Sequence, residues 1–123
     1  MSLKVDLGEL STTLEPYGFA YLVTIGEQGR AHVLAVTPVL TDGGLAVGGV
    51  GRHSQENASA HPDVTLVWPP HEPGGYSLLV DGAATVDGST ITVVPAKATL
   101  HRPAPGADGL RAGSDCVSVP VQS

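Results

Sequence analysis

Apolar and polar residues alternate in short runs along most of the chain, and such alternation is typical of β-strands with one buried face. Seven runs fit this pattern and are predicted to be strands: 18–25, 30–40, 45–49, 63–68, 76–88, 89–96 and 115–121. The 16 glycines and 10 prolines lie mostly between these runs and are predicted to form turns. We therefore expect residues 1–123 to form one all-β domain, in which six or seven antiparallel strands close into a barrel with few exposed edges.

Turn-forming residues predict where the strands reverse and bend. Short turns at 26–29 and 41–44 join the first three strands, which we expect to form an antiparallel meander. Pro38 has no backbone N–H and predicts an edge position or a bulge. Gly82 lies inside a long strand and predicts a β-bulge or the close approach of another backbone. Residues 97–114 have the composition of turns and are expected to form a loop that is mobile.

In two strands, alternation predicts which residues share a face. Val64, Leu66 and Trp68 occupy alternate positions of the strand 63–68, so all three are predicted to lie on one face. In a later strand, Ile91 and Val93 are predicted to lie on one face and Thr90, Thr92 and Val94 on the other. The single tryptophan, Trp68, is therefore expected to anchor the core or a subunit interface, with contact to a cofactor as a secondary role.

One or two short helices are expected beside the strands. Loosely spaced apolar residues over 3–16 predict a helix that Pro16 ends. A second helix is predicted from Ser54 to Ala60, with Ser54 as its N-cap. His61 precedes a proline and therefore stops this second helix.

The charge balance excludes several classes of function. Six Lys and Arg against 12 Asp and Glu give a net charge of −6, which disfavours binding to nucleic acid or to an anionic membrane. No apolar run approaches the ~20 residues of a spanning helix, and the N-terminal sequence lacks the core of a signal peptide. The single cysteine, Cys116, is predicted to lie in the core, and its being single agrees with a reducing compartment. We expect a cytoplasmic protein.

The stretch GRHSQENASAHPDVTLVW, residues 51–68, places polar donors at the start of the second helix. Free backbone N–H groups and the helix dipole attract anions at such a position. Arg52, His53 and Ser54 add side-chain donors, and Gly51 allows a ligand to approach closely. A phosphate-binding site is one interpretation of these residues. A capped helix with a solvated arginine is the other, and these residues alone favour it.

Metal and hydrolase chemistry find little support in the sequence. The five histidines are widely spaced and form no HxH, HxxH or HExxH pair: His32, His53, His61, His71 and His101. We therefore predict no metal site. His32 is interpreted as a half-buried strand residue or one that faces a ligand. No Gly-x-Ser-x-Gly motif surrounds any serine, so a hydrolase triad is not expected.

Several short motifs occur in an order that resembles a known family. They are Gly29-Arg30-Ala31-His32-Val33, Asp42-Gly43-Gly44, Asn57, His61-Pro62-Asp63-Val64-Thr65-Leu66 and the segment LVDGAATV at 79–86. Together they cover about residues 17–95 and resemble the pyridoxamine 5′-phosphate oxidase-like, FMN-binding split-barrel family. The resemblance implies a split β-barrel, a homodimer whose cofactor sites are shared between subunits, and an oxidoreductase-type activity on a small-molecule substrate that the sequence does not identify.

The resemblance also implies a set of cofactor-binding residues. The family's basic residues at the helix start fall here on His53 and Ser54, with Arg52 one position earlier. The backbone at 36–38 would meet the edge of the flavin ring, and the glycine-rich segment 48–50 would line the ribityl chain or the ring. The implied FMN-binding residues are Val36, Thr37, Pro38, Gly49, Val50, Arg52, His53, Ser54 and Asn57. No residue stands out as an acid or base, so no catalytic residue is named and whether the protein is an enzyme is left open.

Departures from the family pattern keep other functions open. Neither position 53 nor 54 is Lys or Arg, and Leu34–Val36 is apolar where family members often carry basic residues. Each lost charge-assisted hydrogen bond would cost roughly 1.5–3 kcal/mol of binding free energy. One alternative is therefore a barrel that binds partners without a cofactor. The others are a barrel that holds the deazaflavin F420, whose acidic tail suits a more basic rim, or one that holds haem through His32 or His53.

Overall fold

The computed structural model of the chain describes residues 1–103. Within them eight strands form one antiparallel sheet: β1 (Ser2–Val5), β2 (Ala20–Ile25), β3 (Ala31–Val36), β4 (Val39–Thr41), β5 (Gly44–Val47), β6 (Asp63–Trp68), β7 (Ser77–Asp87) and β8 (Thr90–His101). The helical segments are the 3-10 turns η1 (Leu7–Glu9) and η2 (Glu27–Gly29) and the α-helices α1 (Leu10–Leu14) and α2 (Arg52–Ala60). The predicted all-β class with two short helices is confirmed.

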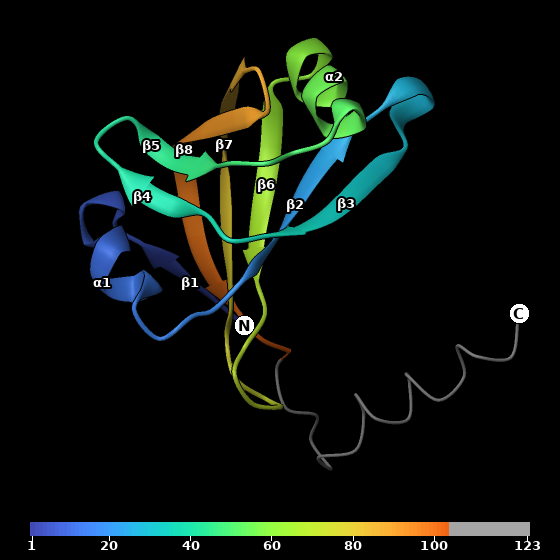
Figure 1. Cartoon of the computed structure of the whole chain (residues 1–123). Coiled ribbons are helices and arrows are strands. Elements are labelled where there is room, and N and C mark those ends of the chain that lie inside the picture. Colours follow the sequence, from blue (N-terminus) through green and yellow to red (C-terminus); the bar gives the residue numbers. More distant parts are fainter. Residues whose placement is uncertain (104–123) are drawn as a thin grey trace, which may run out of the picture.

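The sheet curls until its two ends nearly meet. Its strand order is β3-β2-β6-β7-β8-β5-β4, with β1 paired to the far part of β8. The end strands β3 and β4 follow each other in the chain and are joined by Thr37 and Pro38, so one continuous segment runs around the open side of the barrel (Figure 1). The predicted strand 30–40 is therefore two strands. Both predicted hairpins form, β2 with β3 and β4 with β5, but the break between β3 and β4 places them at opposite ends of the strand order, so they do not make one continuous meander.

The N-terminal segment differs from its prediction. Residues 2–5 form a strand that pairs with β8, with Ser2 opposite His101 and Val5 opposite Ala98. The Asp6 carboxylate then accepts a hydrogen bond from the Gly8 N–H at 3.0 Å and starts the turn η1. Only the last part of the predicted helix 3–16 is α-helical, because pairing with β8 satisfies the first backbone groups in another way.

The long hairpin of β7 and β8 contains the predicted bulge. The register shifts between Asp81 and Gly82, so that Asp81 faces Lys97 whereas Gly82 faces Pro95. A Cβ at Gly82 would collide with the carbonyl oxygen of Val94, so the close backbone approach is also confirmed. β8 continues to residue 101, and 97–101 are thus strand where a loop was predicted. Residues 102 and 103 have no regular structure, and residues 104–114 of that loop, the predicted strand 115–121 and Cys116 lie outside the described residues.

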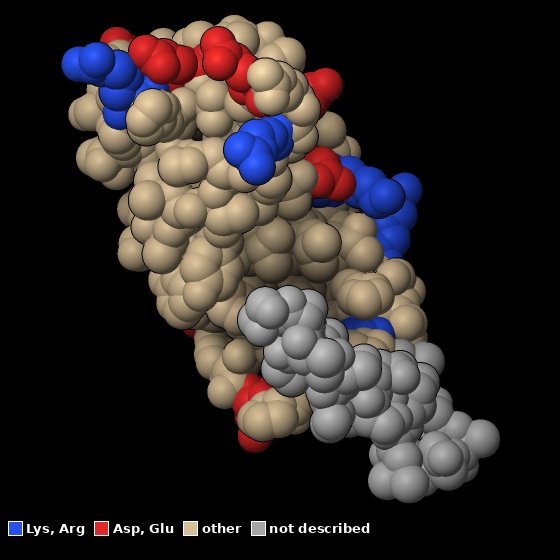
Figure 2. All heavy atoms as spheres, turned by 90° about the vertical axis from the view of Figure 1, so that its right-hand side faces the viewer, with Lys and Arg blue, Asp and Glu red and all other residues tan. Residues whose placement is uncertain are grey.

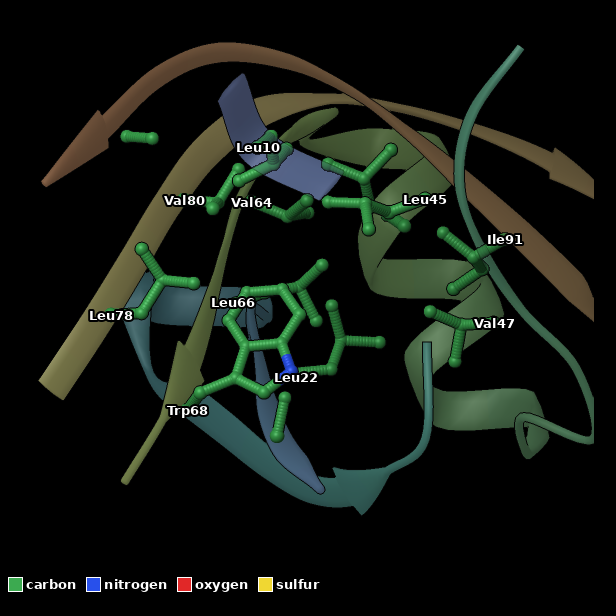
Figure 3. Close-up of a cluster of buried hydrophobic side chains, with 14 of the residues drawn as sticks. Leu10, Leu22, Leu45, Val47, Val64, Leu66, Trp68, Leu78, Val80 and Ile91 are labelled. Atoms are coloured by element: carbon green, nitrogen blue, oxygen red, sulfur yellow. The ribbon is translucent and has the colours of Figure 1, made fainter. Parts of the chain in front are cut away.

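The inward-pointing side chains of the strands fill the interior of the barrel and form the core. Val64, Leu66 and Trp68 of β6 share one face as predicted, this face points inward, and Figure 3 shows the Trp68 indole among Leu22, Leu66 and Leu78. The Trp68 side chain is 2% exposed, which makes it a core residue. Ile91 and Val93 share one face as predicted, and the structure shows that this face points inward. None of the helices within residues 1–103 is long and apolar enough to cross a membrane.

Candidate functional site

Helix α2 closes one end of the barrel and starts earlier than predicted. Its N-cap is Gly51, whose carbonyl oxygen accepts a hydrogen bond from the Gln55 N–H at 3.1 Å. Ser54 lies within the first turn and is 2% exposed, so the prediction of Ser54 as N-cap is wrong. Because the helix begins at Arg52, the small Ser54 side chain points into the barrel. Arg52 and His53 remain exposed on the outer side of the same turn.

Asn57 fixes the inner face of α2 to strand β2. Its Nδ2 donates a hydrogen bond to the Thr24 hydroxyl at 3.2 Å, and Thr24 is fully buried. The Asn57 amide also fills the space beside Gly26, where an added Cβ would lie 3.2 Å from Asn57 Oδ1. Two residues earlier, Gln55 Nε2 donates to the Val50 carbonyl at 2.8 Å. These contacts set the position of the helix relative to the β2–β3 hairpin.

A cleft of about 700 Å³ lies between α2 and the β2–β3 hairpin. This volume falls within the range of small-molecule sites. The ionisable side chains that line it are Glu27, Arg30, His32, His53, Glu56 and His61. Of the nine predicted cofactor-binding residues, only His53 and Asn57 line this cleft.

Two histidines from distant parts of the chain meet in the cleft. The ring centroids of His32 on β3 and His53 on α2 are 6.3 Å apart, with the ring planes tilted by 55°. His32 is half-buried and His53 is exposed. No group of three His, Cys, Asp or Glu side chains in the described part of the chain could hold a metal ion. In the sequence, His32 stood out only as a member of the Gly29–Val33 motif. That motif does not show that His53 lies beside it in the fold.

The residues predicted to meet a flavin ring lie on the open side of the barrel. Val36 packs partly against the core, and Thr37 is exposed. Pro38 has no N–H, so it can offer a ring only its carbonyl oxygen. Pro38 also lines a separate hollow of about 220 Å³ beside Trp68. Because β3 ends the strand order, its outer edge carries backbone groups that no neighbouring strand pairs.

The glycine-rich segment before α2 divides into an open and a closed part. Gly48 and Gly49 are exposed, and an added Cβ at either would meet no atom within 4 Å. Gly49 has a φ of +70°, a conformation that favours glycine, so backbone geometry is sufficient to explain why this position is a glycine. Val50 is 2% exposed, its N–H donates to the Ser89 carbonyl at 2.9 Å, and its carbonyl accepts from Gln55. The backbone polar groups of Val50 are thus already used.

Sequence comparison finds close relatives in mycobacteria. The uncharacterised proteins Mb0449c of Mycobacterium bovis and MT0457 of Mycobacterium tuberculosis are each 43% identical to the chain over 117 residues, covering 82% of the chain and 82% of the relative. The chain belongs to the same family as these two proteins. No family model matches it.

Solved structures of low sequence identity share the fold. A proposed pyridoxamine 5′-phosphate oxidase from Listeria innocua has a TM-score of 0.63 and 17% identity, covering 76% of this chain and 95% of that one. An F420 reductase has a TM-score of 0.60 and 18% identity, covering 76% and 98%. An FAD-binding protein of Mycobacterium smegmatis has a TM-score of 0.60 and 16% identity, covering 83% and 100%. HutZ, the haem storage protein of Vibrio cholerae, has a TM-score of 0.57 and 15% identity, covering 76% and 92%. The chain therefore shares its fold with these proteins, as the resemblance implied for the fold.

The donors around α2 suit a phosphate group. Arg52 and His53 are exposed at the helix start, and Arg30 and His32 face them across the cleft or at its rim. Guanidinium and imidazolium groups both form charge-assisted hydrogen bonds with phosphate oxygens. Ser54 is buried and does not add to this set. The side chains present therefore fit the phosphate of a cofactor such as FMN.

Proposed function

We propose that the protein is a flavin-binding split barrel of the oxidoreductase type, with FMN as its cofactor. The observation that carries the proposal is the cleft of about 700 Å³ between α2 and the β2–β3 hairpin, whose lining includes the donors Arg30, His32 and His53, in a fold whose solved examples include an FAD-binding protein and an F420 reductase. A flavin supplies hydride and electron transfer itself, and the protein supplies position, electrostatics and exclusion of water.

The chain's own residues would divide the binding between them. Arg52 and His53 would hold the phosphate through charge-assisted hydrogen bonds. The exposed Gly48 and Gly49 leave room for the ribityl chain, since no side chain stands over them. The unpaired edge of β3 near Thr37 would offer backbone groups to the ring. No acid or base in this region stands out, so the substrate and the proton donor are not assigned.

A homodimer is part of the proposal, because one face of the barrel is apolar and uncovered. On the outer face of the sheet, Ala35, Tyr21, Val67 and Leu79 lie in one row across four strands. The neighbouring Val33 is 55% exposed. Figure 2, which views the side that carries β3 in Figure 1, shows uncharged residues across its middle and most charges toward its upper end. Burial of such a face against a second copy would stabilise a dimer.

Haem is the second candidate, and one observation favours it. Its two candidate axial ligands, His32 and His53, lie side by side in the structure. Reconstitution with hemin and an absorbance spectrum separates the two candidates, because imidazole-bound haem gives an intense Soret band and a flavin does not. F420 would need a more basic rim than a chain of net charge −6 offers.

The test compares FMN with riboflavin, which lacks the phosphate. The full chain should bind FMN more tightly than riboflavin, as measured by quenching of flavin fluorescence. Arg52→Ala should reduce this preference by about tenfold, since it removes a charge-assisted hydrogen bond. Lys4→Ala is the matched control, because Lys4 is an exposed cation on β1 and does not line the cleft. Equal affinity for the two flavins, or no binding of either, would contradict the proposal and favour a cofactor-free interaction module.

A further inference from the structure

The His32–His53 pair is the most unusual cluster of titratable groups in the described residues. The two rings are separated by 21 positions in the sequence, yet their centroids lie 6.3 Å apart at the mouth of the cleft. Neither ring forms a hydrogen bond with another residue of the described part of the chain. Both imidazoles therefore have N–H groups and lone pairs free to meet a ligand.

Fixed charges around the two rings cancel. The other charged or titratable groups of the cleft and its rim come from η2, the start of β3 and α2 with its C-cap: Glu27, Arg30, Arg52, Glu56 and His61. Two guanidinium groups stand against two carboxylates. The net charge of the cleft is therefore set by the protonation of its imidazoles. This net charge is zero when the imidazoles are neutral and positive when they are protonated.

Two protonated rings at this separation repel each other unless an anion lies between them. An anion held by both rings removes the repulsion and accepts hydrogen bonds from each. Binding of an anion and uptake of protons are then linked, because each favours the other.

We propose that His32 and His53 form a proton-dependent clamp for a phosphate group, so that phosphate affinity falls as the imidazoles lose their protons. That the phosphate belongs to FMN rests on the proposed function, whereas the clamp itself does not. His32 is thereby assigned a ligand role that the family motif did not give it. The clamp replaces a permanent charge by a titratable one and makes cofactor retention depend on pH.

The pH dependence has a definite sign. A phosphate monoester gains its second negative charge near about pH 6, and a free imidazole loses its proton near about pH 6.5. Affinity should therefore fall as pH rises above the range in which imidazoles keep their protons. Above this range each imidazole that must be protonated lowers the affinity by up to about tenfold per pH unit, so two imidazoles give up to about a hundredfold.

The first experiment uses the full chain and inorganic phosphate as the probe. The proton titrations of the individual histidines are followed by NMR with and without phosphate. The clamp predicts that phosphate moves the titration midpoints of His32 and His53 to higher pH by about half a unit or more and leaves His101, which lies outside the cleft, unchanged. Unchanged midpoints for His32 and His53 would overturn the proposal.

The second experiment measures FMN affinity at about pH 6.5 and about pH 8. A fall of about tenfold or more in the wild type, and its loss in the double variant His32→Gln/His53→Gln, supports the clamp. His101→Gln should keep the wild-type fall, and thermal melts confirm that each variant folds. FMN affinity that is equal at both pH values overturns the clamp and leaves flavin binding standing. Absence of FMN binding together with shifted histidine titrations has the opposite meaning: the clamp stands and the proposed flavin function fails.

Discussion

The contact between Asn57 and Thr24 predicts a measurable coupling between α2 and the barrel. Asn57→Ala leaves the fully buried Thr24 hydroxyl without its 3.2 Å partner. An unsatisfied buried group costs about 1–3 kcal/mol of unfolding free energy. Thr24→Val removes the hydroxyl at nearly constant shape and should cost less, about 0.5–1.5 kcal/mol. In the double variant neither partner remains. The loss of unfolding free energy in the double variant should therefore be smaller, by about 1 kcal/mol, than the sum of the losses in the two single variants.

Urea unfolding of the four proteins measures this coupling. The only tryptophan, Trp68, is 2% exposed and reports on the core by fluorescence, while circular dichroism follows the sheet. Equal slopes of free energy against urea would show that the unfolded states are alike. Additive costs, within about 0.3 kcal/mol, would refute the claim that this hydrogen bond fixes the helix. A stability effect in the absence of FMN would also show that Asn57 has a positioning role whatever it contributes to the ligand.

Three further predictions concern the bulge, the half-buried Tyr17 and the apolar face. Gly82→Ala should destabilise the fold by about 1–3 kcal/mol, because its Cβ would collide with a backbone carbonyl, whereas Gly18→Ala, with no atom within 4 Å, should change stability by less than about 0.5 kcal/mol in the same urea assay. Burial raises the pKa of Tyr17, and its hydroxyl donates to the Tyr76 carbonyl at 2.8 Å. The neutral phenol is favoured in the folded state, so its contribution to the free energy of unfolding is present below about pH 10 and lost as pH rises through the raised pKa. Tyr17→Phe should cost about 1 kcal/mol of unfolding free energy at neutral pH and weaken the loss of stability at alkaline pH. An unchanged alkaline profile would count against this reasoning. Val33→Asp should raise the dimer dissociation constant at least about tenfold in sedimentation equilibrium, and an unchanged constant would exclude this face as the interface.

The sequence predicted best what depends on local alternation and on single residues with strict backbone needs. The strand 63–68 and the common face of its alternate residues follow from the period of two, and the bulge at Gly82 follows from a position that tolerates no Cβ. The break at Pro38 was predicted as an irregularity, because proline has no N–H to give to a neighbouring strand. The placing of the two hairpins at opposite ends of the strand order was not predicted, since it depends on the closure of the whole barrel.

What the sequence did not reveal depends on residues that are far apart in the chain. The pairing of Ser2–Val5 with the end of β8 joins segments about a hundred residues apart, and nothing in either run specifies the other. The meeting of His32 and His53 likewise requires α2 to fold back over the β2–β3 hairpin. Ser54 is a good N-cap by residue type, but packing against the barrel starts the helix earlier and buries it. Tertiary packing decided each of these cases.

Gel filtration of the full chain after incubation with FMN tests the central claim most directly. The account predicts that flavin absorbance elutes with the protein at the volume of a dimer, in a ratio near one flavin per chain, at about pH 6.5. FMN that elutes entirely with the small molecules, from a protein that is folded by circular dichroism, would contradict the account.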